Sequence, residues 1–288
     1  MNILEKCETV IRQYDFSSII AGVITLTICI ILELFALPFR QTSLYKFFHP
    51  SKSIVTDLII APMYMLGIFS IIKTVFFFET NILPAKFHVA DHVQSPWLQF
   101  FIYLVIVDFF NYWIHWFHHQ IEFLWQIHKF HHAAVDFILL TGNRIHPLER
   151  IIHNLVVFIP LRFIGAPAET YVLLVLVITV IDEMQHSIVN WDLGWIGRNI
   201  FFSPVGHRIH HSKELEHWDK NFGDIFVFWD KMFGTYYRGK KINTEVGVTQ
   251  NWFNRHGIIF DLIHSTYLSI KEFNESVFSG RWKARHLR

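Results

Sequence analysis

Long apolar runs alternate with short polar segments along this chain. The runs cover residues 17–39, 54–78, 97–117, 148–165 and 168–189. A helix that crosses a bilayer needs about 20 predominantly apolar residues, and four of the runs reach that length. The run 148–165 is marginal because it is shorter and carries Arg150, His153 and Arg162. The pattern predicts an all-α, multi-pass transmembrane helix bundle, although one or two runs could instead be buried core helices.

The polar intervals predict the remaining elements. An amphipathic helix is expected over 121–134, a turn over 141–147, a break at 165–167, a connector over 190–204 and a short helix over 207–216. Residues 251–278 have helical periodicity and either pack over a cytosolic helical cap or lie on the membrane surface. We divide the chain into N-terminal membrane helices (1–96), a catalytic core (97–241) and a basic amphipathic tail (242–288).

Composition supports a membrane protein and narrows its partners. The chain is 52% hydrophobic and 17% charged, and its net charge of +1 argues against a nucleic-acid partner. Residues 1–16 carry mixed charges and no small-residue cleavage site precedes Glu33, so the first run is expected to remain as a membrane helix and not to be a signal peptide. Cys7 and Cys29 are the only cysteines, which excludes a disulfide framework and a cysteine metal site.

Loop charge predicts an orientation. With the N-terminus outside, Arg40, Lys46, Lys129, Arg144 and the basic tail lie on the cytoplasmic side, as the positive-inside rule requires. After residue 237 the tail holds nine Lys or Arg against four Asp or Glu. The same orientation puts every histidine cluster on the cytoplasmic side, in a bacterial inner membrane or the endoplasmic reticulum.

Three histidine clusters carry the candidate chemistry. The first pairs His115 with His119, and the other two are H-x-x-H-H runs: His128, His131 and His132, then His207, His210 and His211. Residues three and four apart share one face of a helix, so each cluster can direct several imidazoles at one place. Eight imidazoles exceed the needs of one metal, and the clusters therefore predict a histidine-rich site for two metal ions.

Polar residues outside the clusters have either a functional or a structural interpretation. His186 lies near the end of an apolar run and needs a partner there, and Asp182, four residues earlier, can hydrogen-bond it. Asp108, an acid inside an apolar run, is either functional or a buried hydrogen-bonding group. His118 is expected beside the site and His146 in a turn. Histidine suits iron and zinc alike, so spacing does not choose the metal.

Residues 108–237 resemble the fatty acid hydroxylase/sterol desaturase superfamily of integral-membrane di-iron oxygenases. Residues 108–119 (DFFNYWIHWFHH), 124–133 (LWQIHKFHHA) and 203–212 (SPVGHRIHHS) look like its three histidine boxes. Gln185-His186-Ser187 looks like its isolated late-helix histidine, and residues 219–236 (DKNFGDIFVFWDKMFGTY) look like its downstream signature.

The resemblance implies a ligand set. It implies that nine residues bind two iron ions, which zinc could replace on purification. These residues are His115, His119, His128, His131, His132, His186, His207, His210 and His211. The chain departs from the family at Trp116, where Arg is frequent, and at Asn190, where some members have a further histidine. Asn190 or water could fill that place, and Asp219 and Asn221 are expected to support the ligands.

The resemblance also implies an activity: O₂-dependent hydroxylation or desaturation of a lipid C–H bond, with O₂ as co-substrate. No G-x-G-x-x-G fingerprint is found, so electrons are expected from a separate electron-transfer protein or reductase. Two alternatives stay open. One is an O₂-dependent monooxygenase that cleaves ether lipids (alkylglycerols), and the other is a non-enzymatic membrane metal-binding or transport protein.

Overall fold

The computed structural model describes residues 3–65, 87–237, 239, 245–249 and 252–279. Within these ranges the chain is mainly helical, and β-structure consists of isolated bridges, among them Phe201 with Phe226 and Ser212 with Val246. The expected all-helical class is confirmed for this part of the chain.

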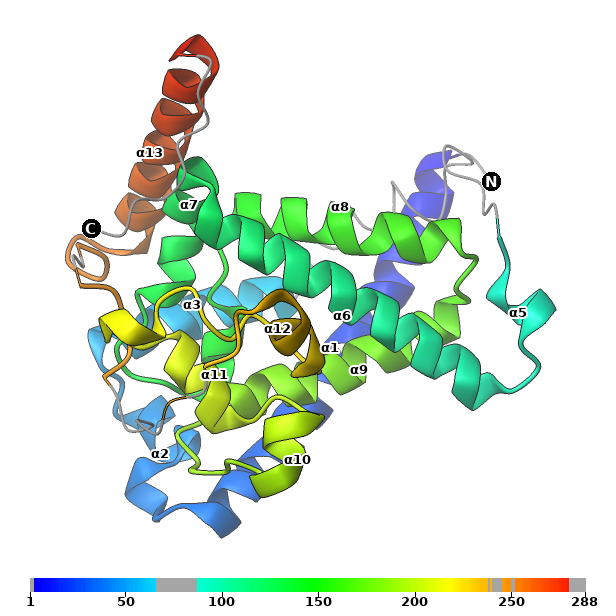
Figure 1. The fold of residues 1–288 in the computed structure, drawn as a ribbon, viewed down its shortest axis with the longest axis horizontal. Coiled ribbons are helices and arrows are strands. Elements are labelled where there is room, and N and C mark those ends of the chain that lie inside the picture. The colour runs from blue at the N-terminus through cyan, green and yellow to red at the C-terminus, as the bar shows by residue number, and fades with distance from the viewer. Residues whose placement is uncertain (1–2, 66–86, 238, 240–244, 250–251, 280–288) are drawn as a thin grey trace.

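Four long helices form the body (Figure 1). They are α1 (Ile3–Ala36), α6 (Pro96–Gln120), α8 (Pro147–Phe163) and α9 (Ala168–Gln185). Helix α1 packs on α9, and α6 packs on α8 and on α7 (Glu122–His132). Shorter helices complete the molecule: α2 (Ser43–Phe48), α3 (Lys52–Met65), α5 (Val89–His92), α10 (Gly194–Asn199), α11 (Pro204–His210) and α12 (Phe228–Phe233).

Two described helices are long and apolar enough to cross a membrane. They are residues Ile19–Ala36 of α1, of which 17% are buried, and Pro96–Gln120. Four runs were expected to reach spanning length and the run 148–165 was marginal. Helix α9 carries acidic residues, α8 has 17 residues and carries arginines, and α3 covers only the first part of the run 54–78. The rest of that run lies outside the described residues.

Local sequence explains where the site-bearing helices begin. The Ser95 and Ser203 hydroxyls accept the backbone N–H groups of Leu98 and Gly206, and proline follows each serine at the first helical position of α6 and α11. A serine N-cap followed by proline is a preferred helix start. The expected break between α8 and α9 is present, with Gly165 at a φ of 68°.

The predicted helix over 207–216 is displaced. Helix α11 ends at His210, and a separate 3₁₀ turn, η3, covers Leu215–His217. The chain leaves the helix because Lys213 N–H donates to the Glu245 carbonyl and Gly247 N–H to the His211 carbonyl. These long-range bonds replace the helical ones.

Buried polar residues tie distant segments together. Glu33, in the first apolar run, accepts hydrogen bonds from the Ser43 backbone N–H (2.7 Å) and from the hydroxyls of Ser43 (3.1 Å) and Ser187 (2.6 Å). A buried carboxylate is tolerated when donors surround it. Glu33 therefore fixes the lower end of α1 against the segment that follows α9.

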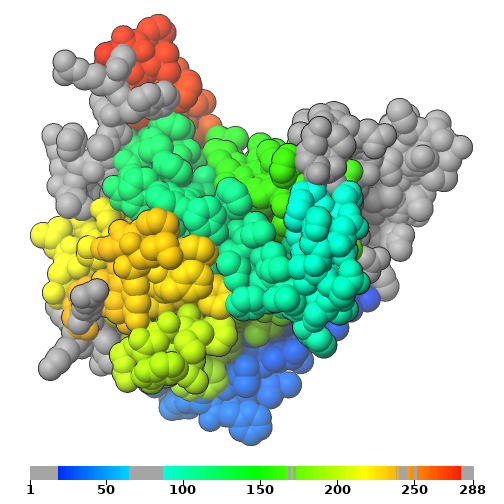
Figure 2. Space-filling view, turned by 45° about the vertical axis from the view of Figure 1, so that its right-hand side comes forward, coloured from blue at the N-terminus to red at the C-terminus, as the bar shows by residue number. Residues whose placement is uncertain are grey.

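Helix α13 (Ile258–Ser279) extends away from the body beside α7 (Figures 1 and 2). Its buried positions are small or polar, namely Asp261, Ser265, Ser269 and Ser276. Its exposed positions are largely apolar, including Ile259, Ile263, Tyr267, Ile270 and Phe278. The tail was expected to be helical over 251–278, but residues 252–257 form turns and Gly257 has a φ of 93°.

Candidate metal centre

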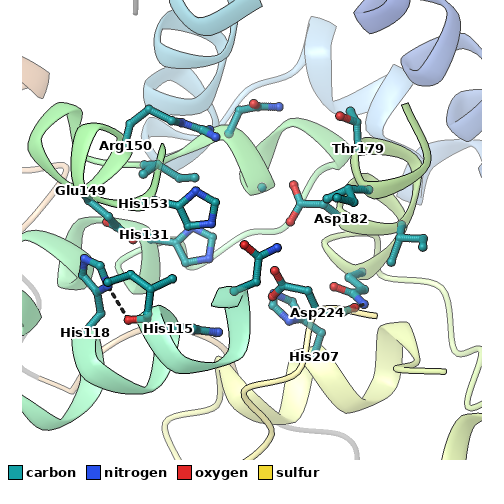
Figure 3. Close-up of a pocket in the computed structure, with 18 of the residues that line it drawn as sticks. His115, His118, His131, Glu149, Arg150, His153, Thr179, Asp182, His207 and Asp224 are labelled. Atoms are coloured by element: carbon teal, nitrogen blue, oxygen red, sulfur yellow. Dashed lines mark hydrogen bonds between the residues drawn. The ribbon is translucent and has the colours of Figure 1, made fainter. Parts of the chain in front are cut away.

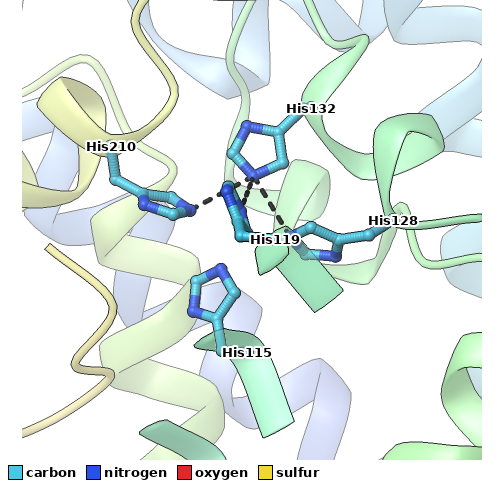
Figure 4. A group of neighbouring side chains, drawn as sticks. All are labelled: His115, His119, His128, His132 and His210. Carbon is cyan, nitrogen blue, oxygen red and sulfur yellow. Dashed lines mark hydrogen bonds between the residues drawn. The ribbon is translucent and has the colours of Figure 1, made fainter. Parts of the chain in front are cut away.

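All nine histidines of the expected ligand set meet in the interior, in two groups. The first group contains His115 and His119 from α6, His128 and His132 from α7, and His210 from α11. The second contains His131, His186, His207 and His211. Within each group one ring nitrogen from every residue lies within 4.8 Å of the others, and Figure 4 shows the first group around a common point.

Each H-x-x-H-H run serves both groups. On α7, His128 and His132 turn to the first group and His131 to the second. On α11, His210 belongs to the first group, whereas His207 and the following His211 belong to the second. Residues four apart stack on one helix face, and the remaining histidine of each run points to the neighbouring face, so the runs bridge the two groups and do not each form a site of their own.

The ring nitrogens are spaced as ligands of a shared cation. His132 Nε2 lies 3.0 Å from His119 Nε2 and 3.1 Å from the Nε2 atoms of His128 and His210. One ring nitrogen donates or accepts a single proton, so hydrogen bonds cannot satisfy all three contacts. Two nitrogens bound to one ion at about 2.0–2.1 Å and at right angles lie about 3 Å apart.

The second group shows the same spacing. His207 Nε2 lies 3.1 Å from the Nε2 atoms of His186 and His211. The Nδ1 atoms of His131, His207 and His211 are buried with no hydrogen-bond partner. The spacing of the Nε2 atoms in both groups therefore fits a metal ion.

Acceptors behind the rings set their orientation in several cases. The Nδ1 atoms of His115 and His210 face the carbonyls of Phe222 (3.1 Å) and Lys220 (2.8 Å). His128 Nδ1 faces the Glu149 carboxylate at 2.6 Å. A proton held on Nδ1 leaves the Nε2 lone pair directed inward, which is the arrangement that metal-binding histidines use.

Burial keeps the rings neutral. It lowers the pKa of His132 well below 6.5, and the neighbouring His119 lowers it further. Burial acts in the same direction on the pKa of His131, His207 and His211. Neutral imidazole is the form that binds metal, so these side chains are available as ligands at neutral pH.

The sequence left open whether His146, Asn190 and His118 take part in metal binding, and each of them forms a hydrogen bond outside the two groups. His146 Nδ1 accepts the Leu148 N–H at the start of α8 and its Nε2 lies 3.2 Å from the Leu262 carbonyl, so it belongs to the turn. Asn190 Oδ1 accepts a hydrogen bond from Arg208 at 2.7 Å. His118 Nδ1 lies 2.7 Å from its own helix's Ile114 carbonyl, and its Nε2 is buried beside the first group.

Asp108 is a structural tether. Its carboxylate accepts the backbone N–H groups of Ile225 (2.8 Å) and Phe226 (3.0 Å) and the indole N–H of Trp229 (2.9 Å). These bonds hold the segment after α11 against α6 and so place the carbonyls behind His115 and His210. Of its two expected roles, the structure gives Asp108 the hydrogen-bonding one.

The supporting residues were predicted in part. Asp219 lies 3.3 Å from His119 Nδ1, and Asn221 bridges the Gly206 carbonyl and the Tyr237 N–H, as expected of supports. The sequence reasoning missed Glu149, whose partner His128 lies 21 positions away. The sequence did contain one indication of this role, because Glu149 is an acid in the first turn of the helix that begins after His146.

A partly open cavity of about 170 Å³ adjoins both groups (Figure 3). His115, His128, His131 and His207 contribute to its wall. A molecule in this cavity lies directly against the candidate metal ligands.

Comparison with known proteins agrees with these features. Residues 100–235 match the fatty acid hydroxylase family. Ornithine lipid hydroxylase OlsE of Rhizobium tropici is 31% identical over 51% of this chain and 44% of its own length. Human alkylglycerol monooxygenase is 31% identical over 50% of this chain and 31% of its own.

A third relative is a sterol desaturase. The Delta(7)-sterol 5(6)-desaturase ERG3A of Gibberella zeae is 27% identical over 66% of this chain and 54% of its own length. The chain thus spans less than two thirds of each of these relatives, and no solved structure matches it. The histidine-bearing part of the chain, residues 100–235, belongs to the fatty acid hydroxylase/sterol desaturase superfamily.

Proposed function

We propose that this protein is a membrane-bound di-iron oxygenase that hydroxylates or desaturates a C–H bond of a lipid with O₂ and external electrons. The observation that carries the proposal is the pair of histidine groups, in which ring nitrogens approach one another to 3.0–3.1 Å without enough protons to pair them. The relatives named as lipid hydroxylase and sterol desaturase support a lipid substrate.

Each group would hold one ion. His115, His119, His128, His132 and His210 would bind the first, and His131, His186, His207 and His211 the second. Iron is the metal of choice because nitrogen ligands suit it and it activates O₂, whereas zinc could occupy the same ligands on purification. Bound iron would supply the oxidising power that removes hydrogen from an unactivated C–H bond.

The chain's own residues would orient and protect this chemistry. The Phe222 and Lys220 carbonyls and the Glu149 carboxylate hold Nδ1 protons, which keeps the Nε2 atoms of their histidines turned inward. Burial of His132 and His211 excludes water from the interior of the site. The adjoining cavity would receive the part of the lipid that reacts.

A partner would supply the electrons. Hydroxylation converts R–H, O₂, two electrons and two protons into R–OH and water, and desaturation removes a second hydrogen. The electrons would come from a separate electron-transfer protein or reductase that docks near the histidine groups.

The protein would span the membrane several times, with the histidine groups in a cap on the cytoplasmic side. The apolar helices α1 and α6 support this arrangement, because most of the first candidate span is exposed in the isolated chain. The loop charges support the orientation.

A second candidate activity is ether-lipid cleavage. It is favoured by the alkylglycerol monooxygenases of human, Danio rerio, Caenorhabditis elegans and Xenopus tropicalis, which are 28–31% identical to about half of this chain. Both activities would use the same ions, so substrate screening separates them.

A single variant tests the metal centre. His132→Ala removes the ring whose Nε2 contacts three others, and we expect it to lose metal from the first group and all lipid oxidation. His256→Ala is the control, because this exposed histidine lies outside both groups. Metal content by mass spectrometry and oxidised lipid by chromatography are the readouts.

Two ions per wild-type chain with O₂-dependent product support the proposal. Product formation by His132→Ala protein that has lost the metal of the first group contradicts it. Metal flux across vesicles without O₂ consumption would instead indicate the transport alternative.

A further inference from the structure

The two histidine groups differ in the support behind their rings. Four of the five rings of the first group turn Nδ1 toward an acceptor at 2.6–3.3 Å. The acceptors are the carbonyls of Lys220 and Phe222 and the carboxylates of Glu149 and Asp219. A proton held on Nδ1 in this way leaves the Nε2 lone pair free for a metal ion and makes the ring a stronger ligand.

The second group has much less support. His186 Nδ1 lies 2.8 Å from the carbonyl of Asp182, one turn earlier on its own helix. The Nε2 atoms of His207 and His211 lie 3.1 Å apart, but the Nδ1 atom of each ring is buried with no hydrogen-bond partner. These two side chains are 3% and 0% exposed, so bulk water does not take the place of an acceptor.

The missing acceptors weaken metal binding. A neutral imidazole carries one proton, and a metal ion on Nε2 requires that proton to sit on Nδ1. Behind His207 and His211 the proton then meets no acceptor, and a buried donor without a partner costs free energy. Without metal the proton can instead sit on Nε2 and be shared with a neighbouring Nε2 atom at 3.1 Å. Metal binding therefore gives up hydrogen bonds in the second group.

The first group has the opposite balance. The acceptors behind its rings hold the protons on Nδ1, so the Nε2 lone pairs of His119, His128 and His210 face that of His132 at 3.0–3.1 Å. A cation between them removes this repulsion and costs no hydrogen bond behind the rings. The first group also offers five rings and the second group four, which acts in the same direction.

One short segment supplies most of the support. Three of the four acceptors belong to residues 219–222. Asp219 and Asn221 have φ angles of 54° and 62°, in the left-handed region that Asn and Asp adopt more readily than other residues with a Cβ. The backbone there turns the carbonyls of Lys220 and Phe222 toward His210 on α11 and His115 on α6.

Buried polar side chains hold this segment in place. The Asn221 amide donates to the Gly206 carbonyl (3.1 Å), and its oxygen accepts the Tyr237 N–H (2.9 Å). The Asp230 carboxylate accepts the backbone N–H groups of Phe222 and Gly223, both at 2.8 Å. Within the described residues nothing comparable reaches the Nδ1 atoms of His207 and His211.

We propose that the two metal positions are unequal. The first group is a tight site prepared by residues 219–222, and the second group is a weaker, exchangeable site that fills last and empties first. Asn221 is a positioning residue, because it acts through the carbonyls of Lys220 and Phe222 and does not touch the metal. The inference rests on the two-ion part of the proposed function and not on the reaction.

A metal titration of the wild-type protein in detergent tests the inequality. Iron(II) is added under nitrogen to the metal-free protein, and it is withdrawn from the loaded protein by graded concentrations of a chelator of known affinity. Inductively coupled plasma mass spectrometry gives the metal per chain. We expect a plateau at one ion per chain and two dissociation constants at least about tenfold apart, since the loss of one outer partner of a ligand lowers metal affinity about 10- to 100-fold. Loss of both ions in a single step overturns the inference.

A matched pair of variants tests the segment. Asn221→Ala removes both hydrogen bonds of the side chain and disfavours the positive φ. We expect the tight step to weaken at least about tenfold and the weak step to stay as in the wild type. Asn199→Ala changes an exposed asparagine at the end of α10 and should leave both steps unchanged. An unchanged tight step in Asn221→Ala overturns the role of the segment.

A further variant assigns the two steps. His207 belongs to the second group alone, so His207→Ala should keep the tight step and lose the weak one. Loss of the tight step with retention of the weak one overturns the assignment. Circular dichroism reports whether each variant folds, and His207→Ala remains informative if Asn221→Ala does not.

The two proposals fail in different ways. Two ions of equal affinity in a protein that oxidises lipid would overturn the inference and leave the oxygenase function intact. Stepwise binding by a protein that oxidises no lipid would overturn the oxygenase function and leave the inference intact. A chain that binds no metal would overturn both.

Discussion

Glu149 links α8 to the first histidine group through one short hydrogen bond to His128 Nδ1. A carboxylate in this position holds the ring, fixes its tautomer and raises its basicity. Glu149→Gln keeps the shape and the acceptor oxygen but removes the charge. We expect the variant to bind metal about 10- to 100-fold more weakly, measured by competition with a chelator of known affinity.

Glu275→Gln is the matched control, because Glu275 forms an ion pair with Lys271 on the surface of α13 at 4.0 Å. It should bind metal as the wild type does. Unchanged affinity in Glu149→Gln would mean that the hydrogen bond behind His128 does not tune the site.

At the residue scale, the sequence predicted which histidines come together better than how they are grouped. Periodicity and the resemblance to a family selected the nine histidines that meet in the interior. Helix periodicity separates the i and i+4 histidines of each run from the third one. Which group each face joins depends on how α7 and α11 face each other, and no local pattern contains that. Glu149 escaped notice for the same reason, since only the packing of α8 on α7 brings it to His128.

At the scale of elements, α13 buries polar side chains and exposes apolar ones, which is the reverse of a helix on the surface of a soluble protein. Ser265 and Ser269 lie inside against α7, and Ile263, Tyr267 and Ile270 face outward. Small residues between helices and apolar residues on the outside are typical of helices in lipid. In the membrane protein proposed above, the outer face of α13 contacts lipid.

Site-directed labelling tests this contact. A fluorophore placed by Ile263→Cys or Ile270→Cys, with Cys7 and Cys29 replaced by Ser, should be quenched by brominated lipids in nanodiscs. The label at Lys271→Cys serves as control, because the neighbouring position turns to another face of the helix. Equal quenching at all three positions, or none at residues 263 and 270, would contradict the assignment.

The sequence predicted most helices but not all of their ends. Apolar runs located α1, α6, α8 and α9, and the serine-proline starts explain why two of the site-bearing helices begin where they do. The helix expected over 207–216 ends early because residues 213 and 247 form bonds with partners distant in sequence. Periodicity contains no information about such partners.

At the scale of the whole molecule, Arg144 joins segments from the two ends of the chain. Its guanidinium donates to Asp57 (3.1 Å), to the Phe130 carbonyl (2.9 Å) and to Asn254 (2.6 Å), and it is fully buried. Arg144→Met would leave the Asp57 carboxylate buried without its counter-charge. We expect a loss of about 3–5 kcal/mol in the free energy of unfolding, measured by denaturant titration in detergent.

The double variant Arg144→Met/Asp57→Asn is the informative control. It removes both charges, so it should recover part of the stability that the single variant loses. A single variant within about 1 kcal/mol of the wild type would mean that the buried pair does not hold these segments together.

The histidine groups draw on residues from His115 to His211, and the segment that positions His115 and His210 continues to Asp230. A ribosome releases these residues in order, so the first box emerges long before the last one. A nascent chain that stops short of α11 lacks His207, His210 and His211, and both groups are then incomplete. Under the proposed function, iron can fill both groups only after the segment that ends at Asp230 has left the ribosome.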